Sequence, residues 1–285
     1  MNTVFLDRPE GFTAERDEIA IVPVPYDKTS SWVKGADKGP AAIIDASAYV
    51  EWYDIQTRSQ IHERGIATRD PIQCDKGPEV LAEMVQQAIG REMDAGVFPV
   101  MLGGEHSVSI GAIRAAAERH DDLTVLQIDA HGDTRETYHG SDHNHACVMA
   151  RAREVASIVQ VGIRALAPEE ADTLDETRVV YAHEILRAHD DAWIERTLLK
   201  LGKKVYVTID LDAFDPSIIP ATGTPEPGGL HWVHVDKLLR GVADRCEVVG
   251  FDVVELCPMQ GQHASAFTAA KLVTRFLSEI FVRRG

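Results

Sequence analysis

Short apolar runs recur along the chain, and in most of them hydrophobic residues follow one another without alternating with polar ones. A strand that is exposed on one face alternates apolar and polar residues, so runs without alternation are typical of strands buried on both faces. The pattern therefore predicts buried strands. We expect them at Ile19–Val24, Phe98–Leu102, Leu123–Ile128, Ser157–Ile163, Val179–Ala182, Val205–Ile209 and Val248–Val254.

Segments with a helical period lie between these runs. Apolar residues within Val80–Ile89 recur at helical spacing, and Gly96 is the expected stop. The last segment, Gln262–Phe281, is expected to form a closing amphipathic helix. Its expected apolar face consists of Phe267, Ala270, Val273, Leu277 and Ile280.

The order of these elements predicts the fold class. Strands that alternate with helices, joined by connections long enough to cross over, favour an α/β fold with a mostly parallel sheet and helices on both faces. Neither a linker rich in Pro, Gly and Ser nor an internal repeat divides the sequence. We therefore expect residues 1–285 to form a single domain.

Composition and charge narrow the functional classes. The 285 residues are 45% hydrophobic and 26% charged, which is typical of a folded globular protein. Acidic residues outnumber basic ones by 45 to 29, which gives a net charge of −16. Such a chain repels nucleic acid and anionic membranes and attracts cationic substrates or divalent metals. We expect neither a nucleic-acid partner nor a membrane partner.

The sequence also suggests a cellular location. The apolar runs are much shorter than the ~20 residues of a membrane-spanning helix. Asp7, Arg8 and Glu10 interrupt the first segment before it could act as a signal peptide. The four cysteines form no CxxC pair and have no regular spacing, so neither a zinc ribbon nor a disulfide framework is indicated. These features predict a cytoplasmic protein.

Polar residues of metal-binding type directly follow three of the predicted strands. The three sequences are GGEHS at Gly103–Ser107, DAHGD at Asp129–Asp133 and DLD at Asp210–Asp212. On an extended chain alternate residues point the same way, so Asp129, His131 and Asp133 should converge. Ligands of such sheets gather beyond the carboxyl ends of the strands. The chemistry is therefore expected at this edge.

Carboxylates crowded into apolar surroundings need compensating positive charge, and a divalent metal supplies it. Four aspartates and two histidines exceed the ligands of one tetrahedral zinc, but they suit two ions that share bridging carboxylates. Manganese is the first choice, and iron, cobalt and nickel fit the same ligand types. One DxH or DxD motif is a weak signal because aspartates also cap helices, whereas the combination at successive strand ends is specific.

Several ordered motifs resemble those of the ureohydrolase family, which contains arginases, agmatinases and related guanidino hydrolases. They are YDKTSSWVKGADKGPAAI near the start, GGEHS, DAHGD, IDLDAFDPSIIPATGTPEPGG at Ile209–Gly229 and GFDVVEL at Gly250–Leu256. The likeness spans nearly the whole chain, and an ordered set is more specific than any one motif. The resemblance implies a three-layer α/β/α fold and two manganese ions per subunit.

The resemblance further implies the ligands of each ion. The first ion is expected at His106, Asp129, Asp133 and Asp210, and the second at Asp129, His131, Asp210 and Asp212. Asp129 and Asp210 would then bridge the ions. A hydroxide shared between them is the implied nucleophile, because metal binding lowers the pKa of water.

Three catalytic groups are implied in the same way. Glu255 corresponds to the carboxylate that clamps the guanidinium group of the substrate through two N–H groups. His145, in the segment DHNHACVM, corresponds to the histidine that transfers a proton to the leaving amine, with His143 as the less favoured alternative. Asp133 is expected to serve both as a metal ligand and as a catalytic residue.

The substrate is inferred from the loop that follows DAHGD. Thr134–Tyr138 (TRETY) lacks the Asn/Ser pattern with which arginases bind the α-amino and α-carboxylate groups of arginine. The TRETY and HACVM segments instead resemble agmatinases. We therefore expect hydrolysis of agmatine, a small cationic guanidino compound, to putrescine and urea, a step of polyamine biosynthesis.

Alternatives to agmatine stay open because of Arg135, whose guanidinium could bind the carboxylate of a different substrate. Guanidinobutyrate, guanidinopropionate and formiminoglutamate hydrolysis are therefore alternatives, as is arginase activity. Arg135 could also form only a surface ion pair with Glu136 or Asp142. A metal-binding protein without catalysis is the alternative from another class. A homotrimer or homohexamer is implied by the resemblance alone.

Overall fold

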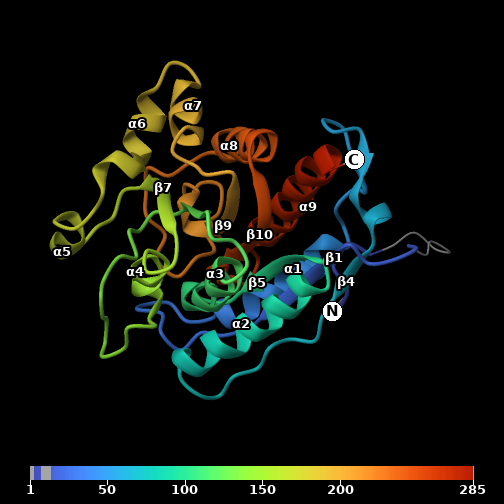
Figure 1. Ribbon diagram of the computed structural model, residues 1–285, viewed down its shortest axis with the longest axis horizontal. Helices are drawn as coiled ribbons and strands as arrows, with labels where there is room; N and C mark the ends of the chain where they lie inside the picture. Colours follow the sequence, from blue (N-terminus) through green and yellow to red (C-terminus); the bar gives the residue numbers. More distant parts are fainter. Residues whose placement is uncertain (1–2, 8–13, 285) are drawn as a thin grey trace.

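A central sheet of parallel strands organises the protein. The computed structural model describes residues 3–7 and 14–284 (Figure 1). Arg8 and Glu10, on which the exclusion of a signal peptide partly rests, lie outside these residues. The strands pair in the order β4-β1-β5-β10-β9-β6-β7-β8, and every neighbouring pair is parallel. The strands are β1 (Ile19–Val24), β4 (Ile66–Thr68), β5 (Phe98–Gly103), β6 (Leu123–Ile128), β7 (Ser157–Ile163), β8 (Val179–Tyr181), β9 (Lys204–Asp210) and β10 (Glu247–Val254).

Helices cover both faces of this sheet. On one face α9 packs against α1 and α8, and α8 packs against α7; on the other α2 packs against α3, and α3 against α4 (Figure 1). The helices are α1 (Gly39–Ser47), α2 (Pro78–Asp94), α3 (Ser109–Ala117), α4 (Val148–Ala152), α5 (Pro168–Ala171), α6 (Ala182–Arg187), α7 (Ala192–Leu198), α8 (Trp232–Arg245) and α9 (Ala264–Arg284). The predicted three-layer α/β/α fold is confirmed.

Short elements complete the chain. A two-stranded antiparallel hairpin joins β2 (Tyr53–Asp54) and β3 (Ser59–Gln60). The 3₁₀ helices are η1 (Ala36–Lys38), η2 (Ile61–Arg64), η3 (His106–Val108), η4 (His145–Cys147), η5 (Glu176–Arg178) and η6 (Leu211–Ala213). Three of them lie at predicted site residues: η3 begins at His106, η4 begins at His145, and η6 begins directly after Asp210.

Two hydrophobic cores form because successive residues of a strand point to opposite faces of the sheet. In β1, Ile19 and Ile21 pack into the core beneath α1, α8 and α9, whereas Ala20 and Val22 pack into the core beneath α2 and α3. All six residues of β1 are buried. The prediction of strands buried on both faces is confirmed.

The closing helix differs from its predicted amphipathic form. Phe267, predicted on the apolar face, is 43% exposed, while the charged Arg275 and Glu279 are buried. The helix is covered by α1 on one side and α8 on the other, so its buried surface is wider than one stripe. The edge strand β4 was not predicted, because three residues are too few to show a pattern.

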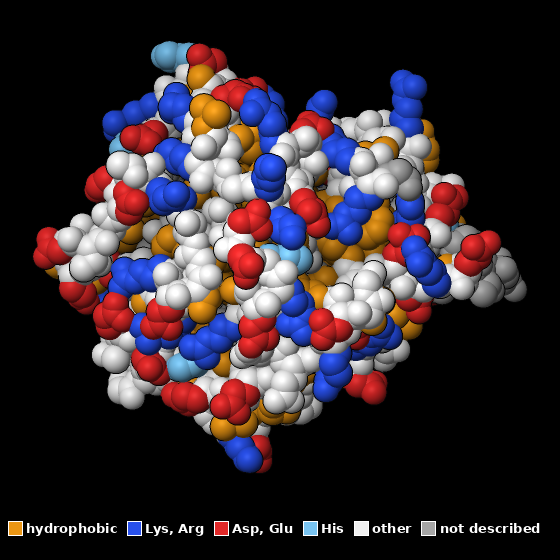
Figure 2. Space-filling model, in the orientation of Figure 1, with side chains coloured by type: hydrophobic (Ala, Val, Ile, Leu, Met, Phe, Trp, Pro, Cys, Tyr) orange, Lys and Arg blue, Asp and Glu red, His pale blue; other side chains and the backbone are white. Residues whose placement is uncertain are grey.

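Two global features bear on partners. Within residues 3–7 and 14–284, no helix combines the length and the apolar character that crossing a membrane requires. Figure 2 shows acidic side chains interspersed with basic ones over one face of the molecule. On that face neither acidic nor basic side chains gather in a single patch.

Candidate active site

Four strands that are neighbours at the centre of the sheet carry the predicted site residues. In the order β5-β10-β9-β6, the chain leaves β6 toward β7 on one side and leaves β9 toward β10 on the other, so the connections from these two neighbouring strands run in opposite directions. Such a switch point leaves a crevice at the carboxyl ends of the strands, where ligands of α/β proteins bind. His106 follows β5, Glu255 follows β10, Asp210 ends β9 and Asp129 follows β6.

Strand alternation accounts for only part of the predicted convergence, because pairing beyond β6 continues as far as a β-bridge at His131, but Asp133 has left the extended conformation. The 3₁₀ helix η6 starts directly after Asp210, whose carboxylate accepts the backbone N–H of Asp212 at 2.8 Å. Asp133 and Glu255 have left-handed backbone conformations, with φ of 52° and 66°. Non-glycine residues in this region are strained, and such strain clusters at functional sites. Tight turns therefore orient Asp212, Asp133 and Glu255, in addition to the strand pairing that reaches His131.

The six predicted metal ligands lie together, and we call them the strand-end cluster. Five of them form two groups of candidate ligands that share one residue, namely His106, Asp129 and Asp210 in the first and Asp129, His131 and Asp212 in the second. Nδ1 of His106 lies 3.0 Å from Asp133, 3.2 Å from Asp129 and 3.5 Å from Asp210. Nδ1 of His131 lies 2.9 Å from Asp212 and 3.7 Å from Asp129.

The electrostatics of the strand-end cluster are those of crowded, buried acids. Burial, followed by repulsion from Asp212 and Asp133, raises the pKa of Asp129 to about 7. Burial and the neighbouring carboxylates also raise the pKa of Asp210 well above its usual range. Burial opposes the charge of His131, but the Asp212 and Asp129 carboxylates outweigh it and raise its pKa to about 10. Positive charge in the cluster is therefore strongly favoured, and within the described residues the two imidazoles supply it by holding protons.

A chain of hydrogen bonds behind His106 determines the orientation of its imidazole ring. The chain engages Nε2, so Nδ1 is the ring nitrogen that faces the strand-end cluster. Tyr206 Oη and Thr208 Oγ1 donate to the Asp252 carboxylate at 2.9 and 2.6 Å, so Thr208 Oγ1 accepts from Nε2 of His106 at 2.9 Å. Burial opposes the charge of His106, but Asp129 and Asp133 beside Nδ1 outweigh it and raise the pKa of the ring well above its usual value. In the neutral ring Nδ1 carries the lone pair. This buried atom has no hydrogen-bond partner within the described residues.

These observations fit a divalent metal. A carboxylate or threonine that fixes the far nitrogen of a histidine is the usual support of a metal ligand. Asp129 is held similarly, by Gln127 Nε2 at 2.7 Å and by the backbone N–H of His131 at 2.6 Å. The donor set of carboxylates and imidazoles suits manganese and other borderline ions.

Glu255 lies in the wall of the same cavity. Its Oε1 accepts the backbone N–H of His106 at 2.7 Å, and its own N–H donates to the carbonyl of Gly104 at 2.7 Å. Gly104 also lies close to the backbone of Tyr26, where a Cβ would be 1.9 Å from the Tyr26 carbonyl oxygen, so only glycine fits this position. Burial and repulsion from Glu105 raise the pKa of Glu255 well above its usual range. Its carboxylate thus needs a positive partner.

The two histidines of the segment DHNHACVM occupy different environments. His145 lines the cavity, where its Nδ1 lies 3.1 Å from Thr29 Oγ1 and its Nε2 lies 3.0 Å from Ser31 Oγ. Burial lowers the pKa of His145, which favours the neutral ring.

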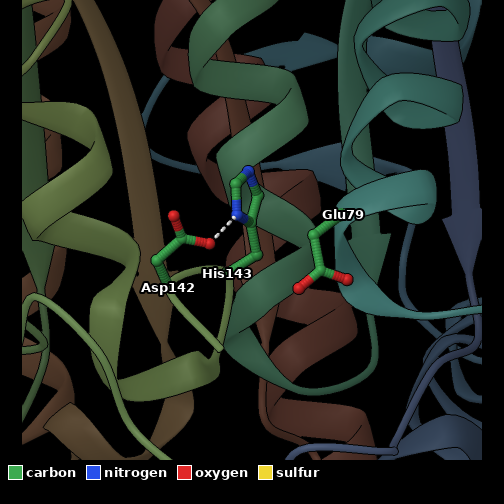
Figure 3. A group of neighbouring side chains, drawn as sticks. All are labelled: Glu79, Asp142 and His143. Atoms are coloured by element: carbon green, nitrogen blue, oxygen red, sulfur yellow. Dashed lines mark hydrogen bonds and ion pairs between the residues drawn. The ribbon is translucent and has the colours of Figure 1, made fainter. Parts of the chain in front are cut away.

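His143 points into a separate group with Asp142 and Glu79, the latter at the start of α2 (Figure 3). Its Nδ1 donates to Asp142 at 2.6 Å, and its Nε2 accepts from Arg114 at 3.1 Å. His143 is not among the residues that line the cavity. The geometry therefore favours His145 over His143 as the residue that meets a substrate.

The cavity has a volume of about 270 Å³, and its inner wall consists of cluster residues. Arg135, in the outer wall, stacks on Tyr138 with its guanidinium carbon 4.4 Å from the ring centre. Its ion-pair partners are Glu170 at 3.6 Å and Glu169 at 3.8 Å. The alternative of an ion pair is therefore confirmed, but its predicted partners Glu136 and Asp142 are wrong, since both of those acids pair with Arg151 instead.

Sequence reasoning missed the residues that support the predicted ones. Thr29 and Ser31 lie more than 110 positions from His145, and Thr208 lies 102 positions from His106. The signal for Thr29 and Ser31 was present, since both belong to the quoted motif YDKTSSWVKGADKGPAAI. Their roles could not be assigned without knowing which side chains they contact.

Comparisons with known proteins agree with this geometry. The family model for the arginase family matches residues 17–278. An N(1)-aminopropylagmatine ureohydrolase from Synechocystis is 38% identical, covering 94% of this chain and 91% of that protein. An agmatinase from Pyrococcus horikoshii is 33% identical, covering 89% and 88%. The crystal structure of agmatine ureohydrolase of Thermoplasma volcanium superposes with a TM-score of 0.87 at 31% identity, covering 94% and 91%.

Proposed function

This chain belongs to the arginase family, whose members it matches over most of its length, and we propose that its reaction is the hydrolysis of agmatine to putrescine and urea. That it is a metal-dependent hydrolase of guanidino compounds follows from the family. The observation that carries the finer proposal is one cavity in which the strand-end cluster, Glu255 and His145 face the same space.

Two manganese ions per subunit are part of this proposal. The first ion would be held by His106, Asp129, Asp133 and Asp210, and the second by Asp129, His131, Asp210 and Asp212. When bound, such a pair supplies a hydroxide near neutral pH. The orphaned Nδ1 of His106 and the raised pKa of Asp129 support a pair of cations at this place.

Glu255 would orient the substrate. A carboxylate binds two N–H groups of a guanidinium in one plane, which holds the central carbon in place for attack. Oε1 of Glu255 already accepts the N–H of His106, so this backbone contact fixes the carboxylate relative to the strand-end cluster. The raised pKa of Glu255 supports the proposal, because a cationic substrate would provide the missing charge.

His145 would move the proton that the departing amine needs. The C–N bond breaks more easily when its nitrogen is protonated as it leaves, and imidazole is suited to that transfer. Thr29 and Ser31 would hold the ring, since each contacts one of its nitrogens. The lowered pKa of His145 makes its protonated form a stronger acid than free imidazolium.

The outer wall favours a substrate without a carboxylate. Arg135 was the reason to consider guanidinobutyrate and formiminoglutamate, but its charge is already balanced by Glu170 and Glu169. N(1)-aminopropylagmatine is the second candidate, because the relative from Synechocystis carries that activity in its name. Both candidates place an ammonium group four methylenes from the guanidino group.

Three further features belong to the proposal on the strength of the family resemblance and the sequence. They are a single domain over residues 1–285, a cytoplasmic location within polyamine biosynthesis, and assembly as a homotrimer or homohexamer.

The test is urea release by chelator-treated protein reconstituted with manganese. Agmatine, N(1)-aminopropylagmatine, arginine, guanidinobutyrate and guanidinopropionate are compared side by side, and formiminoglutamate is assayed through formamide. The proposal predicts the highest kcat/KM for agmatine. A higher kcat/KM for aminopropylagmatine would identify the second candidate as the substrate. A preference for a substrate that carries a carboxylate would contradict the proposal.

A further inference from the structure

One carboxylate in the cavity wall has no partner among the residues that the structure describes. Glu226 lies in the loop between η6 and α8 and lines the cavity together with Glu255 and Asp212. Its side chain makes no hydrogen bond or ion pair with any of the described residues, although it is only partly exposed. The other carboxylates of this wall have identified partners, so Glu226 differs from them.

The other acids of the cavity wall each have a partner within the described residues. The aspartates of the strand-end cluster face His106 and His131. Glu170 accepts the backbone N–H of Thr134 at 2.9 Å and faces Arg135. Glu255 accepts an N–H of the chain and, as proposed above, a guanidinium. Within residues 3–7 and 14–284, Glu226 has neither a hydrogen-bond donor nor a cation beside its carboxylate, and Glu255 has a backbone N–H but no cation.

Arg164 holds the backbone of Glu226 at a fixed place relative to the cluster. Its Nη2 donates to the carbonyl oxygens of Glu226 and Asp212, each at 2.7 Å, and its Nη1 donates to the carbonyl of Gly162 at 3.2 Å. One guanidinium group thus ties the loop of Glu226 to the turn that carries a cluster residue. The hydrogen bonds of Arg164 therefore fix the position of the Glu226 backbone relative to the strand-end cluster.

We propose that Glu226 is the specificity residue that binds an ammonium group of the substrate tail while the guanidino group lies against Glu255. This inference rests on the proposed function, whose two candidate substrates both carry that ammonium. Glu226 and Glu255 would each bind one positive charge of a doubly charged substrate. The carboxylate of Glu226 would thus allow a cationic tail to bind in a cavity whose wall also contains Arg135. A carboxylate–ammonium contact in a partly buried wall is a strong charge-assisted hydrogen bond.

The test compares Glu226→Gln with the unaltered, manganese-loaded protein on two substrates of matched shape. Agmatine ends in an ammonium, and pentylguanidine replaces that ammonium with a methyl group. We expect kcat/KM for agmatine to fall roughly tenfold to a hundredfold in the variant, with little change for pentylguanidine. Glu184→Gln, which changes an exposed glutamate of α6 that does not line the cavity, is the matched control and should change neither value.

Equal effects of Glu226→Gln on both substrates, or no effect on either, would overturn the inference. A separate result would overturn the proposed function: no urea from any guanidino compound in the unaltered protein. In that case calorimetric binding of agmatine and pentylguanidine decides the inference. Agmatine binding weakened only in Glu226→Gln supports it, and equal binding by both proteins contradicts it.

Discussion

Two clusters of buried charge lie in this molecule, and they differ in whether the chain supplies a permanent counter-charge. The strand-end cluster gathers aspartates around two imidazoles at the carboxyl edge of the sheet. The second, which we call the Arg275 cluster, surrounds Arg275 of α9 with Asp54, Asp236 and Glu279. The Arg275 side chain is only 4% exposed, yet an arginine keeps its charge under all ordinary conditions.

Asp129 and Asp54 show the difference, although burial raises the pKa of Asp236 in the Arg275 cluster as well. Burial and like charges raise the pKa of Asp129 to about 7. Burial alone would also raise the pKa of Asp54, but the N–H of Thr57 and the Arg275 guanidinium hold it below its usual range. Buried charge by itself therefore does not mark a functional site. A cluster without its own permanent cation is the one that calls for a metal.

Asp210→Asn should break the strand-end cluster with the largest effect. The change keeps the size of the side chain but removes a charge that we assign to both ions. We expect bound manganese to fall and urea release from agmatine to drop by at least about 10⁴-fold, since several kcal/mol of transition-state stabilisation depend on the metals. Asp236→Asn, in the Arg275 cluster, is the matched control and should keep both. Normal activity of Asp210→Asn would contradict the assignment.

Glu255→Gln should separate substrate binding from metal binding. The amide oxygen can still accept the N–H of His106, so the backbone there should keep its place. Loss of a charged contact to the guanidinium should reduce kcat/KM for agmatine by roughly a hundredfold. Metal analysis should find the same manganese content as in the unaltered protein. Loss of the metals together with activity would show that Glu255 acts as a ligand instead.

His145→Ala should slow turnover while the metals stay bound. The expected decrease in kcat is roughly a hundredfold, which is the usual contribution of a positioned proton donor. His143→Ala is the control from the same segment, and it should have a much smaller effect because that ring faces Asp142 and Arg114. The reverse order of the two variants would contradict the proposed role of His145.

Arg275→Met should act on stability and leave the chemistry intact. Removing the cation leaves three buried or half-buried acids without a counter-charge, which lowers the free energy of unfolding by about 3 kcal/mol. We expect the midpoint of thermal unfolding to fall by roughly 5–10 °C. Lys237→Met, which breaks an exposed ion pair with Asp191, should cost much less. Manganese loss in folded Arg275→Met would mean that the two clusters are coupled.

The stability of the metal-free protein should depend on pH in a direction set by the strand-end cluster. The pKa of Asp129 rises from 3.8 to about 7 and that of His131 from 6.5 to about 10 on folding. The folded state therefore holds more protons than the unfolded chain above about pH 4, so stability falls as pH rises. Asp212, with its pKa lowered to about 2, contributes the opposite sign only below about pH 4.

Bound metal would take the place of these protons. The gap in unfolding temperature between manganese-loaded and metal-free protein should therefore widen from pH 6 to pH 9, which calorimetric scans of both forms can measure. A gap that is constant or shrinks over this range would contradict the electrostatic account.

The strands could be predicted because each hydrophobic run reports its own burial. Ile19–Val24 and Leu123–Ile128 were predicted with the bounds that the structure has. The closing helix was harder, because the burial of Arg275 depends on Asp54 and Asp236, which come from distant parts of the chain. The periodicity of hydrophobic residues does not reveal ion-pair partners that lie far apart in the sequence.

The same limit applies to the site. The members of the strand-end cluster could be named because each directly follows a strand, and strand ends meet at one edge. Their supports, such as Thr208 and Asp252 behind His106, are ordinary strand residues in sequence. Glu226 lies within a motif quoted for the resemblance, but only its missing partner in the structure distinguishes it.

The central claim is that the strand-end cluster is completed by two metal ions. The most direct test is to titrate manganese into chelator-treated protein while bound metal and urea release from agmatine are measured in the same samples. The account predicts that activity starts near zero and reaches its plateau at two bound ions per chain. Full activity without metal, or a plateau at one bound ion, would contradict it.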